Sequence, residues 1–394
     1  MHFLFISTIL TTTGGIETLI IRMSKWLLDR GYQVTLLANR IPVRRELFHK
    51  NLRIVEAKDQ LTELCFYYKA KKVWADLKID RPDVIKTFDL TASWIGTVLS
   101  TRISPAPKVI FGNYFAYVIP AGWNPLKHGS FRLLLLNLRR NFADNSIICM
   151  SEEQIAEFRR HYGHHRRPNF WPLPVEDPSR NRQDRTPQWG RIVSIGRLET
   201  MKEYNIYMID VIARLRQRGL PVKWIVYGDG ILENDMKARI NAQGLGEAIE
   251  LKGILPYTEF AAALQDAYVF VGMGTAIIEA ALCRVPGIVA LAYDTTGVTY
   301  GPLYRFTFGN CGSLMETPPA TTVEAEIERV LKFSRQEYEA EMKRTREYAQ
   351  RYEMDGTMER FLRIAEKAAV PRASRGLFYL FYLHSMAVKF RHKI

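Results

Sequence analysis

Arg197 and Lys202 are the residues of this chain whose types and spacing point most clearly to chemistry. They follow an apolar run at 191–195 that is typical of a buried strand, and an apolar-periodic stretch typical of a helix comes next. Free backbone N–H groups and the helix dipole favour an anion at such a strand-to-helix turn. Arginine presents a planar fork to phosphate oxygens, and lysine adds a mobile positive charge. The spacing therefore predicts a diphosphate site and a phosphorylated or nucleotide-linked substrate.

A second anion-binding pattern lies in Gly272-Met273-Gly274-Thr275, where another predicted strand ends in two glycines and a helix begins. The glycines leave room for a phosphate at the helix N-terminus, and Thr275 can cap the helix. Glu279 follows four residues after Thr275, so both can face one site, where the carboxylate would accept the two hydroxyls of a ribose. The plainer interpretation of Glu279 is an exposed helical glutamate.

Two further glycine pairs also follow predicted strands. Gly14 and Gly15 let backbone N–H groups approach a ligand, although a tight turn explains this pair equally simply. Gly228 and Gly230 lie at the carboxyl end of a strand, where α/β sheets bind ligands, but turn chemistry also explains them. Neither a third glycine at dinucleotide-binding spacing nor a GxxxxGK[ST] motif is present. The anion-binding features of the second half together predict a nucleotide-diphosphate pocket.

The elements that position these residues alternate between apolar strands and amphipathic helices, which predicts an α/β fold with parallel sheets. We expect strands at 3–7, 34–38, 52–56, 83–88, 108–112, 146–151, 191–195, 222–227, 249–252, 268–271 and 287–292. We expect helices near 16–30, 62–78, 92–101, 131–141, 202–218, 232–243, 256–265 and 275–282.

The length of 394 residues suits two domains rather than one core. We expect doubly wound, Rossmann-like domains at 1–168 and 191–355 that face a central cleft. Proline and polar residues mark a linker at 169–190. A helical tail at 356–394 would pack on the first domain or on a membrane.

The net charge of +14 is unevenly distributed along the chain. Residues 1–170 hold 25 Lys/Arg and 14 Asp/Glu, residues 171–370 hold 25 and 27, and residues 371–394 hold five and none. The excess favours an anionic partner such as a membrane surface, whereas a solubilising surface is the simpler alternative. Residues 131–140 and 376–391 combine apolar and basic residues and could lie on such a membrane; a core-facing helix is the alternative for the first. No nucleic-acid motif accompanies the charge, so we expect no nucleic-acid partner.

Composition also bears on the compartment. The four cysteines form no CxxC pair, so neither a disulfide framework nor a zinc site is expected, and a reducing compartment fits. No run of 18 uncharged apolar residues occurs, and the apolar start lacks the charged region and cleavage site of a signal peptide. We therefore expect a cytoplasmic protein, peripheral on the inner face of the cell membrane.

The order of these motifs resembles that of the retaining GT-B glycosyltransferases of family 4, also called glycosyl transferases group 1. The resemblance runs to about residue 295. It rests on Gly14-Gly15-Ile16-Glu17, Ala143-Asp144, Ser151-Glu152, Pro172-Leu173-Pro174-Val175, Gly196-Arg197-Leu198 with Lys202, Gly228-Asp229-Gly230, and Gly272 through Glu279-Ala280 to Pro286. It implies a GT-B fold whose first domain binds the acceptor and whose second domain binds the nucleotide sugar.

The resemblance also implies residue roles. Arg197 and Lys202 would be the catalytic cations that hold the donor diphosphate and neutralise the leaving nucleotide. No metal and no cofactor would be needed, and the donor would be a UDP- or GDP-sugar. Glu279 would bind the ribose, within a substrate-binding set of Gly14, Gly15, Gly228, Gly230, Gly272, Gly274, Thr275 and Glu279.

The implied reaction is hexosyl transfer with retention, to a saccharide or lipid-linked acceptor, in surface polysaccharide or lipopolysaccharide biosynthesis. Two positions depart from the family pattern. Val271 stands eight positions before Glu279, where the family usually has a first Glu, and Asn113 and Tyr114 stand where a His often follows a strand. Two alternatives stay open: a non-catalytic sugar-nucleotide-binding GT-B partner, which Val271 motivates, and an enzyme like a nucleotide-sugar epimerase.

Overall fold

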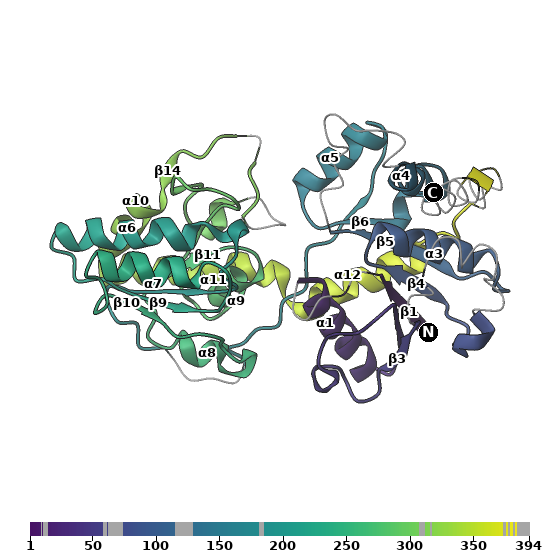
Figure 1. Cartoon of the computed structure of the whole chain (residues 1–394), viewed down its shortest axis with the longest axis horizontal. Coiled ribbons are helices and arrows are strands. Elements are labelled where there is room, and N and C mark those ends of the chain that lie inside the picture. Colours follow the sequence, from purple (N-terminus) through teal and green to yellow (C-terminus); the bar gives the residue numbers. More distant parts are fainter. Residues whose placement is uncertain are drawn as a thin grey trace, which may run out of the picture. The chain divides into compact units, whose positions relative to one another are not determined.

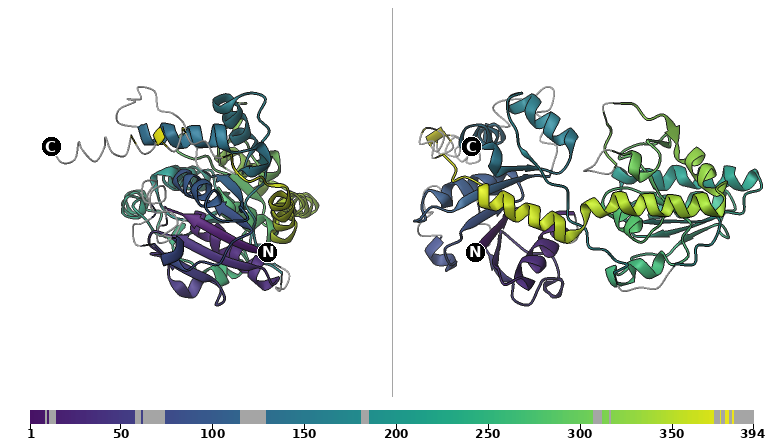
Figure 2. Two further views of the ribbon diagram at one scale, coloured as in Figure 1. Left: turned by 90° about the vertical axis from the view of Figure 1, so that its right-hand side faces the viewer. Right: turned by 180° about the vertical axis from the view of Figure 1, so that it is seen from behind.

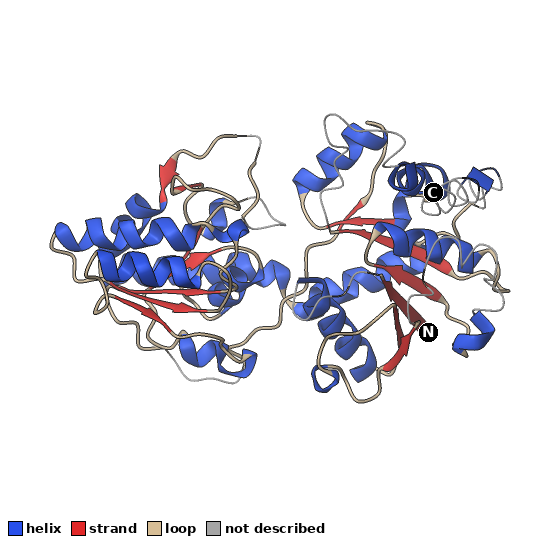
Figure 3. Cartoon of the chain, viewed as in Figure 1, coloured by secondary structure: helices blue, strands red, loops and turns tan. Residues whose placement is uncertain are grey.

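The computed structural model describes residues 1–8, 10, 15–57, 61, 74–114, 129–180, 185–306, 312–315, 317–372, 376, 379–380 and 383. The chain forms two compact units, each a layered arrangement of helices and strands (Figures 1 and 3). Unit 1 comprises Met1–Pro174 with Met358–Ile394, and unit 2 comprises Val175–Thr357. The fold class is therefore α/β with two Rossmann-like units.

Unit 1 is built on a seven-stranded sheet with the order β3-β2-β1-β4-β5-β6-β7, in which neighbouring strands pair in parallel. Its strands are short apolar runs with few exposed side chains, as expected where helices cover both faces. They are β1 His2–Ser7, β2 Gln33–Ala38, β3 Arg53–Glu56, β4 Val84–Thr87, β5 Lys108–Asn113, β6 Ile147–Cys149 and β7 Asn169–Phe170. The helices are α1 Gly15–Asp29, α3 Leu90–Ser100, α4 Gly129–Asn141, α5 Glu152–Tyr162 and most of α12 Met354–Lys367.

Alternate residues of β1 show how unit 1 is layered. Leu4 and Ile6 join a core cluster with α3 and α4 on one face of the sheet. Phe3 faces the opposite side, where its ring centroid lies 5.8 Å from that of Phe361 on α12. The N–H of Val109 donates to the carbonyl of Ala369, which anchors the segment after α12 beside β5 (Figure 2).

Unit 2 is built on a five-stranded parallel sheet with the order β10-β9-β8-β11-β12, plus an antiparallel pair, β13 and β14. The strands are β8 Arg191–Ile195, β9 Lys223–Tyr227, β10 Ile249–Leu251, β11 Val269–Gly272, β12 Gly287–Val289, β13 Val298–Thr299 and β14 Thr321–Thr322. The helices are α6 Tyr204–Gln217, α7 Glu233–Ala242, α8 Phe260–Ala263, α9 Thr275–Leu282, α10 Val323–Leu331 and α11 Arg335–Ala349. One core cluster joins the sheet to α6, α7 and α10, and another joins it to α8, α9 and α11.

The segment 169–190, predicted as a linker, partly belongs to the units instead. β7 extends the sheet of unit 1 by pairing with β6. Trp171 is fully buried, and its N–H donates to the carbonyl of Cys149. Val175 pairs through its backbone with Tyr352 and Met354, so the first residue of unit 2 is fixed beside the start of α12.

The two predicted membrane-facing stretches have different outcomes. Leu134, Leu135 and Leu138 of α4 are buried in the core of unit 1, so the core-facing interpretation of 131–140 is confirmed. The stretch 376–391 lies almost entirely outside the described residues. Within the described part of the chain, no helix is both long and apolar enough to cross a membrane.

Candidate active site

The two predicted anion-binding motifs of unit 2 meet at one place in the sheet. β8 and β11 are neighbours, although β9 and β10 lie between them in sequence. The chain leaves β8 towards α6 on one face and leaves β11 towards α9 on the other. The loops therefore diverge at the strand ends, where α/β sheets usually form a crevice that binds the ligand. Arg197 and Lys202 lie on the first loop, and Gly272–Thr275 on the second.

Lys202 folds back over the start of its own loop. Its Nζ lies so close to Gly196 that a Cβ at this position would collide with it. Gly196 has φ 152°, a conformation that residues with a Cβ rarely adopt. The N–H of Lys202 donates to the Glu199 carbonyl at 2.7 Å, and Asn205 Nδ2 donates to the Lys202 carbonyl at 3.0 Å. These hydrogen bonds fix the backbone of Lys202, and its ammonium lies over Gly196 at the start of the loop.

The charges around Lys202 do not balance. Burial, the largest cause, and the nearby Arg197 guanidinium lower the pKa of Lys202 from 10.5 to about 8, although the Glu199 carboxylate opposes both. Arg197 Nη1 lies 2.7 Å from Glu199 Oε1. No ion pair joins Lys202 to a carboxylate of the described chain. Two cations thus share one carboxylate, which leaves a local positive charge for a dianion to neutralise.

Gly228 and Gly230 shape this loop by letting a second backbone approach it. A Cβ on Gly228 would collide with the Gly196 carbonyl, and a Cβ on Gly230 with the Leu198 carbonyl. The N–H of Leu198 donates to the Asp229 carbonyl at 2.7 Å, which joins the two loops. These contacts explain both glycines without a ligand, and direct substrate binding by them stays a prediction.

The start of α9 is uncapped and open. Gly274, not Thr275, is the N-cap residue, with φ 69° and no side-chain cap hydrogen bond, so the expected capping by Thr275 is wrong. Thr275 is the first residue of the helix because the chain needs a positive φ just before it, which only glycine adopts freely. Among the described residues, nothing lies within 4 Å of a Cβ built on Gly274. The N–H groups of the first helical turn therefore suit an external acceptor.

Glu279 lies on α9 with only 4% of its surface exposed. Its interpretation as a solvent-exposed helical glutamate is therefore wrong. Binding of a ribose by this carboxylate stays a prediction.

Val271 shows why the expected upstream carboxylate is missing. It lies inside β11, pairs with Ile288 of β12 and is fully buried. Its carbonyl accepts the Ser194 hydroxyl at 2.7 Å, and Trp224 Nε1 donates to that hydroxyl at 3.0 Å. A glutamate at this position would bury its carboxylate in the core. The fold therefore disfavours a glutamate here.

Two family profiles match this chain along most of its length. Glycosyltransferase Family 4 matches residues 13–177, and Glycosyl transferases group 1 matches residues 177–351. The chain belongs to the family 4, group 1 glycosyltransferases of the GT-B type.

Solved structures share the fold of this glycosyltransferase. HepE from Anabaena, in complex with UDP and glucose, is 17% identical with a TM-score of 0.61, covering 93% of this chain and 100% of its own. The lipopolysaccharide outer core galactosyltransferase WaaB is 11% identical with a TM-score of 0.60, covering 93% and 99%. A glycosyltransferase from Rickettsia africae is 12% identical with a TM-score of 0.67, covering 93% and 98%. No curated protein sequence matches the chain significantly.

The corresponding crevice of unit 1, between β1 and β4, is filled by Asp89. This carboxylate N-caps α3 by accepting the Ala92 N–H at 2.8 Å. It also accepts the N–H and the hydroxyl of Thr8, both at 2.7 Å, and burial raises its pKa. Gly15 is the exposed first residue of α1, and Gly14 lies outside the described residues. An Asp directly before an apolar helix is an N-cap signal that could have identified Asp89 from sequence.

The end of β5, where the family often has a His, holds a different polar group. Asn113 lines a small pocket together with Leu138, Glu157, Phe158, His161 and Tyr162. The sequence interpretation missed His161, which supplies an imidazole here from α5. Tyr114 is buried, and its hydroxyl has no hydrogen-bond partner among the described residues.

A fully buried lysine lies beside Tyr114. The Nζ of Lys86 is 4.9 Å from the ring centroid of Tyr114 and 5.1 Å from that of Phe88, and it donates to the Thr87 carbonyl at 3.2 Å. A Cβ on Gly112 would collide with both Lys86 and Tyr114, so glycine is required on β5. Burial holds the pKa of Lys86 well below its usual value. No sequence signal separates Lys86 from an ordinary exposed lysine.

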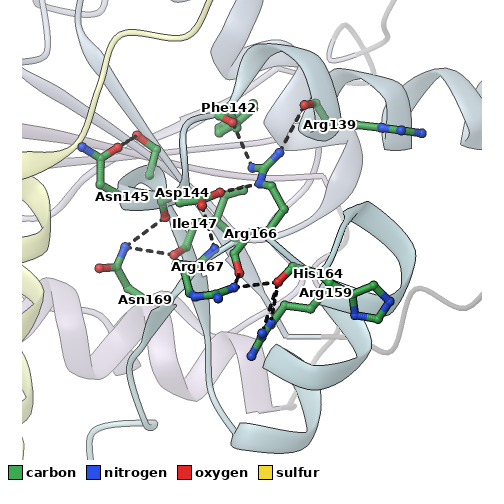
Figure 4. Close-up of polar contacts among 11 residues, drawn as sticks. Arg139, Phe142, Asp144, Asn145, Ile147, Arg159, His164, Arg166, Arg167 and Asn169 are labelled. Atoms are coloured by element: carbon green, nitrogen blue, oxygen red, sulfur yellow. Dashed lines mark hydrogen bonds and ion pairs between the residues drawn. The ribbon is translucent and has the colours of Figure 1, made fainter.

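The Ala143-Asp144 block of this glycosyltransferase is structural. The Asp144 carboxylate pairs with Arg166 and accepts the N–H of Arg167 at 2.6 Å (Figure 4). Arg166 also donates to the carbonyl of Arg139, in the last turn of α4, at 3.2 Å and to that of Phe142, directly after α4, at 3.0 Å. A guanidinium at this place satisfies the last carbonyls of a helix.

A metal site was not expected. In the parts of the chain that the structure describes, no group of three or more His, Cys, Asp or Glu residues could hold a metal ion. Metal-free catalysis stays a prediction.

Proposed function

We propose that this glycosyltransferase moves a hexose from a nucleoside-diphosphate sugar to a saccharide or lipid-linked acceptor, with retention of anomeric configuration, in surface polysaccharide or lipopolysaccharide synthesis. One observation carries the proposal: the loop with Arg197 and Lys202 follows β8, and the uncapped start of α9 follows β11, the neighbouring parallel strand. A diphosphate supplies the negative charge and the acceptor oxygens that this place lacks.

The proposed mechanism is electrostatic. Cleavage of the sugar–phosphate bond places negative charge on the departing diphosphate. Arg197 and Lys202 stabilise this charge with charge-assisted hydrogen bonds, and the first N–H groups of α9 add further donors. Because the Lys202 ammonium already lies over Gly196 at the start of the loop, we expect little reorganisation during the reaction.

The donor and pathway parts of the proposal draw support from similar structures. The HepE structure contains UDP and glucose, and WaaB is a lipopolysaccharide outer core galactosyltransferase. UDP-hexoses are therefore the first donors to test, followed by GDP-sugars.

A screen of nucleotides and donors tests the function directly. Thermal shift with UDP, GDP and ADP should identify one stabilising base, and the matching nucleotide sugar should then be cleaved or transferred. NMR of the product anomer checks retention. Binding without turnover would instead favour the non-catalytic partner, for which the buried Val271 is the specific observation. Interconversion of nucleotide sugars without transfer would favour an epimerase.

The excess positive charge of residues 1–170 and 371–394 motivates the membrane part of the proposal, a cytoplasmic enzyme held at the inner membrane face. Flotation with liposomes that contain anionic lipids should recover the full chain at low salt. Failure to float under these conditions would count against a membrane-bound acceptor.

A further inference from the structure

Tyr293 has a backbone conformation that needs an explanation. Three non-glycine residues of the described chain have positive φ: Lys78, Arg284 and Tyr293. Lys78 and Arg284 come directly after helical segments, where a left-handed residue is common. Tyr293 has φ 59° and follows no helix. For a bulky residue away from a helix end, this conformation is unfavourable and is often kept for function.

The surrounding loop holds Tyr293 firmly against the loop of the cations. The N–H of Tyr293 donates to the carbonyl of Met201 at 3.0 Å, one residue before Lys202. The next residue, Asp294, accepts the N–H groups of Thr296, Gly297 and Val298 at 3.0, 2.9 and 3.1 Å. The strained residue is thus fixed from both sides, beside the predicted diphosphate site.

The packing of the described residues does not depend on the ring of Tyr293. Its side chain is 70% exposed, and its hydroxyl makes no hydrogen bond to a described residue. Asparagine or glycine would adopt the same backbone at lower cost. The backbone conformation therefore does not explain why residue 293 is a tyrosine, and we look for the reason in a ligand that the exposed ring can contact.

The position of Tyr293 in the sheet favours a sugar as the ligand of this ring. A nucleotide sugar carries its diphosphate in the middle, with the base at one end and the sugar at the other. Ile231 and Ile254 are each 71% exposed just after β9 and β10, on one side of β8. These apolar side chains suit a flat base. Tyr293 follows β12, on the opposite side of the β8–β11 crevice, where the other end of the donor would lie.

We infer that the ring of Tyr293 is a platform on which the hexose of the donor stacks. An aromatic ring offers an apolar face to the C–H groups of a sugar and a hydroxyl to its polar edge. This inference rests on the proposed function and adds to it a residue that recognises the sugar.

Two variants separate this role from a structural one. Tyr293→Asn removes the ring and suits the left-handed backbone, and Tyr293→Phe keeps the ring as the matched control. Titration calorimetry compares UDP, GDP and ADP with hexose conjugates of whichever nucleotide binds. We expect Tyr293→Asn to unfold at the same or a higher denaturant concentration and to bind the free nucleotide as the wild type does. Its affinity for at least one hexose conjugate should fall about three- to tenfold, while Tyr293→Phe stays near wild type.

Each other outcome overturns the inference. Equal losses for the nucleotide and its conjugates would assign the ring to the base. Unchanged affinity for all conjugates would leave the ring without a role in the site, and a large loss of stability would make Tyr293 structural. If the wild type binds none of the three nucleotides, the proposed function itself fails, which is a distinct result.

Discussion

The two crevices of the molecule, between β1 and β4 in unit 1 and between β8 and β11 in unit 2, have the same topology but opposite chemistry. In unit 1 the helix that follows the second strand, α3, is capped by Asp89, which also binds Thr8. In unit 2 the equivalent helix, α9, begins at Gly274 with no side-chain cap and open space beside it. Unit 1 supplies its own carboxylate at this point, whereas in unit 2 no described side chain caps the helix, and we propose that the donor diphosphate binds there.

The difference indicates which of the two places could gain free energy by binding an anion. The donors around Asp89 are satisfied within the fold, so they stabilise unit 1 and gain little from a ligand. In unit 2, α9 begins uncapped at Gly274 after β11, and on the loop after the neighbouring β8 two cations share one carboxylate. Helix N–H groups without an acceptor and cations without enough carboxylates lower the stability of the free protein. A bound diphosphate would supply both the acceptors and the negative charge, and so raise the stability.

Removing either cation should produce the largest effect. Arg197→Ala or Lys202→Ala should lower kcat/KM by about 10²–10³, equivalent to about 3–4 kcal/mol, because each removes a donor aimed at the departing diphosphate. Steady-state kinetics gives the ratio, and circular dichroism checks the fold. Lys237→Ala on α7, an exposed lysine paired with Glu233, is the control and should retain activity. Unchanged kcat/KM in both site variants would refute their catalytic role.

Removing the internal anion of unit 1 should act on stability alone. Asp89→Ala leaves the N–H groups of Thr8 and Ala92 without their acceptor, which should lower the free energy of unfolding by about 2–3 kcal/mol. Denaturant titration measures this change. Under conditions in which the variant is fully folded, its affinity for the nucleotide should stay within twofold of that of the wild type. A selective loss of nucleotide affinity in a stable variant would break the comparison between the crevices.

Lys86 tests whether unit 1 also carries an electrostatic cost. Because its pKa is lowered in the fold, the unfolded chain takes up a proton below pH 10.5 that the folded chain binds less readily. Folding stability therefore rises as pH increases towards 10.5, so burying the amine costs more stability at neutral pH than near pH 11. Lys86→Met should raise the free energy of unfolding by about 1–3 kcal/mol at pH 7. The gain should shrink near pH 11; a destabilised variant would show that the amine has a stabilising role.

The sequence predicted the strands of both sheets well because buried parallel strands are short, continuous apolar runs. The strand 191–195 and the helix 275–282 were predicted with the observed bounds. The helices α10 and α11 were not assigned, whereas α12 overlaps the predicted helical tail, and β7 was not recognised in a proline-rich stretch. Its pairing depends on a strand about twenty residues earlier, which local patterns do not reveal.

The site was predicted as a set of motifs, but not their internal geometry. The sequence placed Arg197, Lys202 and Gly274 at strand ends, and the sheet order brought them together. It did not show that Lys202 folds over Gly196 or that Val271 lies in the core, since both depend on contacts between loops and strands distant in sequence. The sequence did not identify Tyr293 as a candidate site residue, because the feature that marks it is its positive φ angle, which only the structure shows.

The titration of Lys202 gives the smallest expected effect, a change of nucleotide affinity with pH. It tests whether the charge of the site in unit 2 depends on this lysine. The diphosphate should bind the protonated form of Lys202, so affinity for a nucleoside diphosphate should fall about tenfold between pH 7 and 9, as the pH passes the pKa of about 8. Lys202→Arg should remove this dependence because arginine stays charged. An equal decline in both proteins would assign the pH dependence to another group.

Calorimetric titration at pH 7 of the wild type, Arg197→Ala, Lys202→Ala and the Lys237→Ala control with UDP, GDP and ADP tests the central claim most directly. We predict that one nucleotide binds the wild type and the control with equal affinity, and that each site variant loses at least about tenfold, because a charged hydrogen bond to phosphate is removed. Equal affinity in all four proteins would contradict the claim that the anion missing from unit 2 is supplied by the donor.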